Sequence, residues 1–184
     1  LVYFCKKQDL EYLKIIAVGI FTLLVAFLSI CVLSPKKVAA SKTVIVHHSM
    51  ESVIEDLTDL EFWQQWHPYL DSAKEGSIIN SSNSIEWLSN TNTGGKIEVD
   101  YHPDSGRISF TTAFEKDGIW KVYQGEFLIE GNERETKISW IYVGEEFPFL
   151  KRPANYFIKE VIEKTMERGL FRLKNSLRQK DYLQ

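Results

Sequence analysis

The chain has 184 residues, enough for a membrane segment and one folded domain, and a second folded domain is not expected. Residues 1–42 carry six lysines and two acids, whereas residues 43–149 carry seven basic and nineteen acidic residues, an excess that excludes a nucleic-acid-binding domain. The two cysteines, Cys5 and Cys31, both precede residue 34, which excludes a disulfide framework, a zinc cluster or a cysteine nucleophile from the remainder.

The first element in chain order is an apolar segment at residues 15–33, which contains neither a charge nor a proline. Its length is close to the ~20 residues that a helix needs to cross the hydrocarbon core of a bilayer. Lys14 precedes it, and Ser-Pro-Lys-Lys follows it, which would end the helix and place charges at the headgroups. We therefore predict a tail at 1–14, a single transmembrane helix at 15–33 and a linker at 34–42.

A cleaved signal peptide is the alternative to this anchor, because Val38, Ala39 and Ala40 are small residues placed before Ser41 as at a cleavage site. The length of the apolar segment and the lysines that follow it favour the anchor. Three lysines lie on each side of the span, so the positive-inside count is tied. The short tail favours an N-in, C-out orientation, with the folded domain outside the cytoplasm.

The remaining residues, 43–184, begin with a predicted strand at 43–48, rich in β-branched residues. Ser49 is a predicted N-cap for a helix at 51–57, and a second short helix at 60–66 is ended by Pro68. Alternating apolar residues and intervening turns then indicate antiparallel strands, with a hairpin across the turn at 103–106. These strands are predicted at 84–88, 96–102, 107–114, 119–130 and 136–144.

A long amphipathic helix is predicted at 153–180. Its apolar face is expected to contain residues spaced four apart, namely Phe157, Val161, Thr165, Gly169, Leu173 and Leu177. At 1.5 Å per residue such a helix is ~40 Å long and can span a whole small sheet. Together the elements predict an α+β fold in which a sheet of six or seven antiparallel strands curls around the last helix.

The order of elements, with three stretches of sequence, resembles the SRPBCC superfamily of START-like helix-grip proteins, and within it the polyketide cyclase/dehydrase and lipid-transport-like group. The matching stretches are 57–69 (LTDLEFWQQWHPY), 135–144 (ETKISWIYVG) and 166–177 (MERGLFRLKNSL). The resemblance runs from about Lys42 to the C-terminus, and several members of the group carry a membrane span before the first strand. It implies a helix-grip domain at 43–184 with a cavity between sheet and C-terminal helix, which holds lipids, hormones or other apolar ligands.

The resemblance also suggests ligand-binding residues. The aromatic second helix would close one end of the cavity, with Trp66 and Tyr69 at the mouth and His67 donating a hydrogen bond to a ligand carbonyl. The alternative is that these side chains plug the end of the sheet as packing. Aromatic residues on inward strand faces are further candidates, with a purely structural core role as their alternative: Trp87, Tyr101, Phe110, Phe114, Trp140 and Tyr142.

Other chemistry finds little support in the sequence. His47 and His48 are adjacent on a strand and point to opposite faces, so they cannot chelate one metal together. Metal-protease, redox, triad and phosphate-loop motifs cannot be traced, so neither a metal nor a cofactor is expected, and no catalytic residue is assigned.

Glu145 and Glu146 are candidates for acid–base catalysis, although loop carboxylates are usually solvated. The basic face of the terminal helix could contact anionic lipid or simply be solvated: Lys159, Lys164, Arg168, Arg172 and Arg178.

Three functions remain open at this point. The first hypothesis is a membrane-anchored domain that binds or transfers a lipid-like or polyketide-like molecule. The second is a cyclase/dehydrase-type enzyme that uses the same cavity and requires a buried titratable pair. The third is a non-catalytic interaction domain with a filled core.

Overall fold

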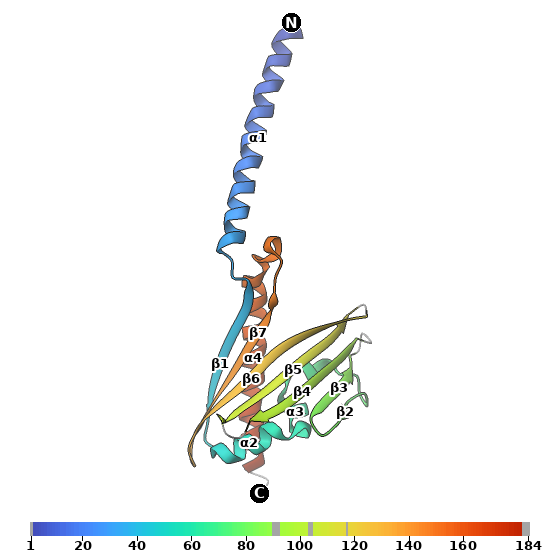
Figure 1. The fold of residues 1–184 in the computed structure, drawn as a ribbon, viewed down its shortest axis with the longest axis vertical. Helices are drawn as coiled ribbons and strands as arrows, with labels where there is room; N and C mark the ends of the chain where they lie inside the picture. The colour runs from blue at the N-terminus through green and yellow to red at the C-terminus, as the bar shows by residue number, and fades with distance from the viewer. Residues whose placement is uncertain (1, 90–92, 103–104, 117, 182–184) are drawn as a thin grey trace.

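The computed structural model of the chain describes residues 2–89, 93–102, 105–116 and 118–181. A long N-terminal helix, α1 (Val2–Leu33), extends away from an α+β domain (Figure 1). Residues 12–33 of this helix are apolar enough to cross a membrane, and only 6% of the most apolar stretch is buried. The helix is therefore not a core element of the domain. It continues through the segment that was predicted as a separate tail.

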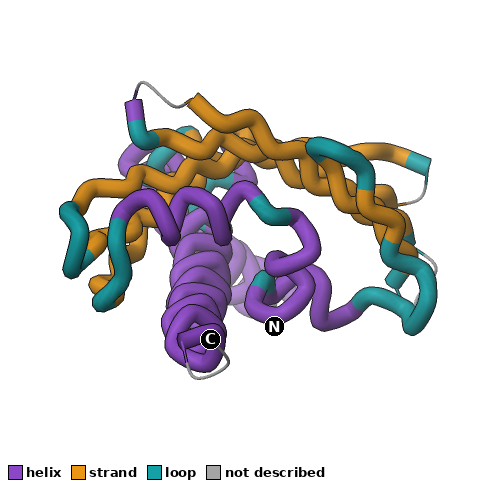
Figure 2. The backbone as a smooth tube through the Cα atoms, turned by 90° about the horizontal axis from the view of Figure 1, so that it is seen from below, coloured by secondary structure: helices purple, strands orange, loops and turns teal. Residues whose placement is uncertain are grey.

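The domain is built on one antiparallel sheet of seven described strands in the order β1-β7-β6-β5-β4-β3-β2. Figure 2 shows all the helices of the domain on one side of this curved sheet, with the long C-terminal helix α4 (Ala154–Asp181) crossing it. This is the predicted α+β helix-grip arrangement. The strands are β1 (Lys37–Val46), β2 (Ile79–Asn80), β3 (Ser84–Leu88), β4 (Gly94–His102), β5 (Arg107–Lys116), β6 (Ile119–Gly131) and β7 (Thr136–Glu146).

Strand β1 starts at Lys37, six residues before the predicted start at Thr43, so most of the segment expected as a linker belongs to the sheet. The strand pairs with β7 from Lys37 opposite Glu146 onward, and Val38 and Ala40 are buried. Pairing with a neighbouring strand, rather than local β-propensity, extends β1 toward α1. Only residues 34–36 separate the two elements.

Two short helices follow β1. Ser49 caps α2 (Met50–Thr58) by accepting a hydrogen bond from the Ser52 backbone N–H at 3.2 Å, as predicted. Asp59 caps α3 (Leu60–Trp66) in the same way, through the N–H of Glu61 at 2.9 Å. The 3-10 helix η1 (Pro68–Ser72) then carries the chain toward the sheet edge.

The strand predictions hold with small shifts at the ends, and β4 and β5 form the predicted hairpin, with His102 opposite Arg107. Turn residues 103 and 104 lie outside the described part of the chain. Strand β2 was not predicted, because a strand of two residues is too short to show alternation. A second 3-10 helix, η3 (Phe149–Lys151), precedes α4.

The predicted apolar face of α4 is correct only in its second half. Gly169, Leu173 and Leu177 are buried, but Phe157 and Val161 are exposed. A spacing of four residues rotates the face by about 40° per step on a helix of 3.6 residues per turn, so the ends of the stripe differ by about 200°. The face that packs on the sheet contains Ile158, Ile162, Met166, Leu170, Leu173 and Leu177.

Candidate functional site

A cavity of about 470 Å³ lies between the first half of α4 and the sheet. Its apolar wall consists of Val38, Phe147, Ile158, Val161 and Ile162. The opposite wall is aromatic and is formed by Tyr69, Phe114, Tyr123 and Tyr142, with Gly144, Thr165, Lys121 and Glu145 completing the lining. The site thus combines apolar surface with a few polar groups, which is the composition of a small-molecule site.

The aromatic wall is a continuous series of rings. The Tyr69 and Phe114 rings form a T-shaped contact at 5.1 Å between centroids, Phe114 lies 6.1 Å from Tyr123, and Tyr123 stacks on Tyr142 at 5.9 Å. These contacts come from η1, β5, β6 and β7, so the wall depends on the curvature that brings these elements together.

The tyrosine hydroxyls of this wall stay protonated. Burial, and next the nearby Tyr123, raises the pKa of Tyr69 to about 12. Burial also raises the pKa of Tyr142 and of Tyr123, and the charge of Glu145 adds to both effects. A neutral hydroxyl both donates and accepts a hydrogen bond, so this wall can bind a carbonyl, carboxyl or hydroxyl group of an otherwise apolar molecule.

Beyond the aromatic wall the interior is filled. The His67 ring stacks on Trp63 at 4.9 Å and lies 5.4 Å from Trp140. Neither of its nitrogens has a hydrogen-bond partner among the described residues, and burial lowers the pKa of His67 to about 3, so the ring is neutral. Other core polar atoms are likewise buried without a partner in the described chain, among them Trp66 Nε1, Trp140 Nε1 and Thr112 Oγ1.

The structure divides the predicted ligand contacts into groups. Tyr69, Phe114 and Tyr142 line the cavity. Trp66, which was predicted at the mouth, and His67, which was predicted to donate a hydrogen bond to a ligand carbonyl, are both buried in the packed interior and do not line this cavity. Helix α3 ends at Trp66 and the extended backbone of His67 turns its side chain inward before Pro68. Contact of any of these residues with a ligand remains a prediction.

The other predicted strand residues lie elsewhere in the inner face. Trp140 is buried among the interior rings, Tyr101 packs partly buried against the core, and Trp87 and Phe110 cover glycines on neighbouring strands. A Cβ at Gly95 would lie 2.2 Å from the Trp87 ring, and one at Gly125 would lie 2.1 Å from the Phe110 ring. Both aromatic side chains therefore lie flat against the sheet.

Several lining residues were not predicted. Tyr123 occupies the same face of its strand as Phe127 and Ile129, so the alternation within the predicted strand 119–130 could have identified it. Val38 was missed because β1 was expected to start later. Ile158 and Ile162 were missed because the predicted stripe of α4 followed the wrong residues.

A larger hollow of about 720 Å³ lies across β2 to β6, lined in part by the predicted ligand contact Trp87 and by Leu88, Trp120 and Val122. Its cation Lys96 already pairs with Glu98 at 2.9 Å and with Glu86 at 3.1 Å. We take the inner cavity as the candidate site because it lies between α4 and the sheet and because three tyrosines line it.

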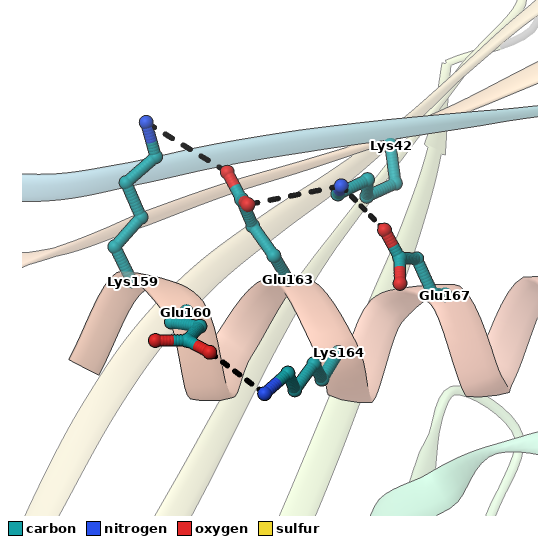
Figure 3. Close-up of polar contacts among 6 residues, drawn as sticks. All are labelled: Lys42, Lys159, Glu160, Glu163, Lys164 and Glu167. Atoms are coloured by element: carbon teal, nitrogen blue, oxygen red, sulfur yellow. Dashed lines mark hydrogen bonds and ion pairs between the residues drawn. The ribbon is translucent and has the colours of Figure 1, made fainter. Parts of the chain in front are cut away.

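Two lysines of the predicted basic face of α4 form ion pairs with acids of the same helix. Figure 3 shows Lys42 of β1 bridging Glu167 at 2.5 Å and Glu163 at 3.7 Å, with Lys159 on Glu163 and Lys164 on Glu160. This network fastens the β1 edge of the sheet to α4. This network is a contact between two elements of the fold. Among the described residues, no group of three or more His, Cys, Asp or Glu could hold a metal ion.

Solved structures share this fold at low sequence identity. DynU16, a protein of the dynemicin biosynthetic locus, aligns with a TM-score of 0.52 at 18% identity, over 77% of this chain and 47% of its own. The di-domain ARO/CYC protein BexL of the BE-7585A biosynthetic pathway gives 0.56 at 14% identity, over 76% and 46%. A conserved protein from Geobacillus kaustophilus gives 0.59 at 12% identity, over 77% and 95%.

The chain therefore spans just under half of the length of the first two proteins. Neither a family model nor a curated protein matches its sequence. At these identities the likeness shows the fold alone, a helix-grip-like fold shared with the ARO/CYC protein BexL. The resemblance stated from the sequence is confirmed at that level.

Proposed function

We propose that the domain binds an apolar small molecule, lipid-like or polyketide-like, in the cavity between α4 and the sheet. One observation carries this proposal: tyrosines whose pKa is raised by burial line a cavity whose other wall is apolar. Such a site favours a ligand with a long apolar body and one polar group. The apolar body would pack against Ile158, Ile162 and Phe147, and its polar group would lie among the tyrosines.

We further propose that α1 anchors the domain in a membrane as a single span, with the domain on the extracytoplasmic side. The support is the length and exposure of its apolar surface, together with the short connection to β1. Anchoring would hold the cavity beside a bilayer, which is the reservoir of most lipid-like molecules.

A cyclase/dehydrase-type enzyme is the second candidate, and the observation in its favour is Glu145 beside Tyr123 and Tyr142 at the cavity. A carboxylate and a phenol could together move a proton on a bound ligand. Glu145 is exposed to water, which weakens it as a base in a dry site, so binding ranks first. A scaffold with a filled core ranks third, because the aromatic interior is packed but the cavity at its edge is not.

The proposal can be tested by photolabelling the full chain in phosphatidylcholine vesicles that contain a diazirine-bearing palmitic acid. Mass spectrometry should find the label on peptides containing Tyr123, Tyr142 and residues 158–165, as well as on α1. Gly144→Phe should block this labelling, because a Cβ there makes ordinary contacts, 3.4 Å from Tyr142 Cε1 and 3.5 Å from the Val38 carbonyl, while the ring projects into the cavity.

The expected loss of cavity labelling is about tenfold, or ~1.4 kcal/mol of binding free energy. Labelling of α1 should not change, and Val143→Ile on the exposed face of the same strand serves as the matched control. Cavity peptides that stay unlabelled in the natural chain, or equal labelling in Gly144→Phe, would contradict the binding proposal.

A further inference from the structure

Exposed apolar side chains gather at the end of the domain nearest to α1. We call Phe149, Leu150, Phe157 and Val161 the apolar collar. Their exposed fractions are 38%, 61%, 74% and 64%. The first two belong to or adjoin η3, and the other two lie one turn apart on α4. Large apolar side chains grouped in this way mark an interaction surface rather than a folding requirement.

The collar is fixed close to the end of the apolar helix. Asn155 Nδ2 donates a hydrogen bond to the Pro35 carbonyl at 2.6 Å, and the Phe147 backbone N–H donates to the Lys36 carbonyl at 2.9 Å. The end of α1 also contacts η3 directly, and Figure 1 shows η3 and the start of α4 directly below α1. Val161 is seven residues into α4, only ~10 Å along its axis.

The composition of this end matches a membrane interface. Lys36 and Lys151 are exposed, and the Arg152 guanidinium lies 5.4 Å above the Phe149 ring. Aromatic and aliphatic side chains with adjacent cations are typical of segments that lie in the headgroup region.

The collar and the cavity share surface. Val161 belongs to both, and the neighbouring Ile158 and Phe147 line the cavity wall. An apolar molecule in the headgroup region would therefore meet a continuous apolar path from the collar into the site.

We propose that the apolar collar inserts into the interfacial region of the same bilayer that α1 spans, so that the cavity opens onto lipid and its ligand enters without crossing water. This inference rests on the proposed membrane anchor. The occupant of the collar is the lipid surface itself, and a second copy of the chain is the competing outcome of the test.

The test places one nitroxide at a time on the full chain, in a Cys5→Ser, Cys31→Ala background reconstituted in phosphatidylcholine and phosphatidylglycerol vesicles. Phe157→Cys reports the collar. Phe171→Cys is the matched control, because Phe171 is 65% exposed on nearly the same face of α4 but ~21 Å farther along it. Leu23→Cys reports the span. Collisions with lipid-soluble oxygen and with a water-soluble nickel chelate measure depth.

We expect the label at 157 to favour oxygen and the label at 171 to favour nickel. A label at 157 that behaves like the label at 171, with lipid exposure at 23, overturns the collar and leaves the anchor standing. Water exposure at 23 overturns the anchor and the collar with it. Spin–spin broadening at 157 with shielding from both reagents shows a second copy on the collar and also overturns the proposal.

A matched pair of charge substitutions tests entry through the collar. Phe157→Glu should lower cavity photolabelling by the diazirine-bearing palmitic acid about tenfold, because a carboxylate resists insertion into the headgroup–acyl boundary. Phe171→Glu should leave the labelling unchanged. Equal labelling of the two variants would show that the ligand does not pass the collar.

Discussion

His67 is a titratable residue that is buried among aromatic rings. Its ring is enclosed by Trp63, Trp66 and Trp140, and burial lowers the pKa from 6.5 to about 3. The unfolded chain therefore takes up a proton at this residue near pH 6.5, while the folded chain does not until about pH 3. The stability that depends on the neutral ring is present above pH 6.5 and declines as the pH falls.

We predict that this residue lowers the free energy of unfolding by about 2 kcal/mol between pH 7 and pH 5. His67→Phe should remove that contribution and keep the packing of the rings. Urea denaturation of the full chain in detergent micelles, followed by tryptophan fluorescence at both pH values, measures the difference. All five tryptophans lie in the domain, so the signal reports on it.

Thr112→Val is the control, because the Thr112 hydroxyl is equally buried without a partner among the described residues but does not titrate in this range. It should be neutral or slightly stabilising at both pH values, with the pH dependence of the natural chain. The same pH dependence in His67→Phe would show that His67 is not the group responsible.

Single site residues were predictable from sequence where alternation or the resemblance fixed their face. Phe114 and Tyr142 follow from strand alternation, and Tyr69 follows from its place after the second helix. The inward turn of His67 was not predictable, because it depends on the extended backbone between α3 and η1. Neither the residue type nor the neighbouring sequence indicates that His67 is buried without a hydrogen-bond partner among the described residues.

At the scale of elements, the contact of α4 with the sheet depends on Gly169. A Cβ at this position would lie 2.7 Å from Trp140 Cζ3 and 3.0 Å from Pro68 Cδ, so the helix approaches both β7 and η1 through a glycine. Alanine would force the helix away from the sheet. Overpacking of this kind costs about 1–3 kcal/mol, and the better helix propensity of alanine offsets up to ~1 kcal/mol of it.

We predict a net loss of about 1–2 kcal/mol for Gly169→Ala, visible as roughly tenfold faster hydrogen exchange at amides of β7 and of the second half of α4. Phe171→Ala on the exposed side of the same helix should change exchange little, since exposed substitutions are usually within about 0.5 kcal/mol. Unchanged hydrogen-exchange protection in Gly169→Ala would mean that the contact of α4 with the sheet accommodates the added methyl group without loss of stability.

The elements that the sequence predicted best are those with their own periodic pattern. Strands β3 to β7 alternate clearly, and α2 and α3 carry cap residues at their starts. The first half of β1 contains Lys37, Ala39, Ala40 and Ser41, which have little strand propensity, and it is a strand because β7 pairs with it. The stripe of α4 failed for a geometric reason, since a constant spacing of four residues does not stay on one face.

At the scale of the whole molecule, the shortness of residues 34–36 limits where the domain can go. Three extended residues reach at most about 10 Å, and two of them have backbone carbonyls bound by Asn155 and Phe147. Under the proposed anchoring by α1, the domain stays against its own bilayer. It can present or modify a ligand there, but it cannot carry one to a distant membrane.

We therefore predict that the full chain in donor vesicles will not accelerate the transfer of a pyrene-labelled fatty acid to acceptor vesicles, although the diazirine-bearing palmitic acid labels its cavity in the same vesicles. Transfer is measured by the loss of pyrene excimer fluorescence as acceptor vesicles are added, with Gly144→Phe as the chain whose cavity is blocked. The short connection predicts the same transfer rate for both chains at every acceptor concentration, because neither domain can leave its bilayer.

A rate that rises with acceptor concentration for the natural chain and not for Gly144→Phe would show that the cavity exchanges its contents between membranes. The collar would then have to leave the bilayer surface, and the end of α1 would have to separate from η3 against the hydrogen bonds that Pro35 and Lys36 accept.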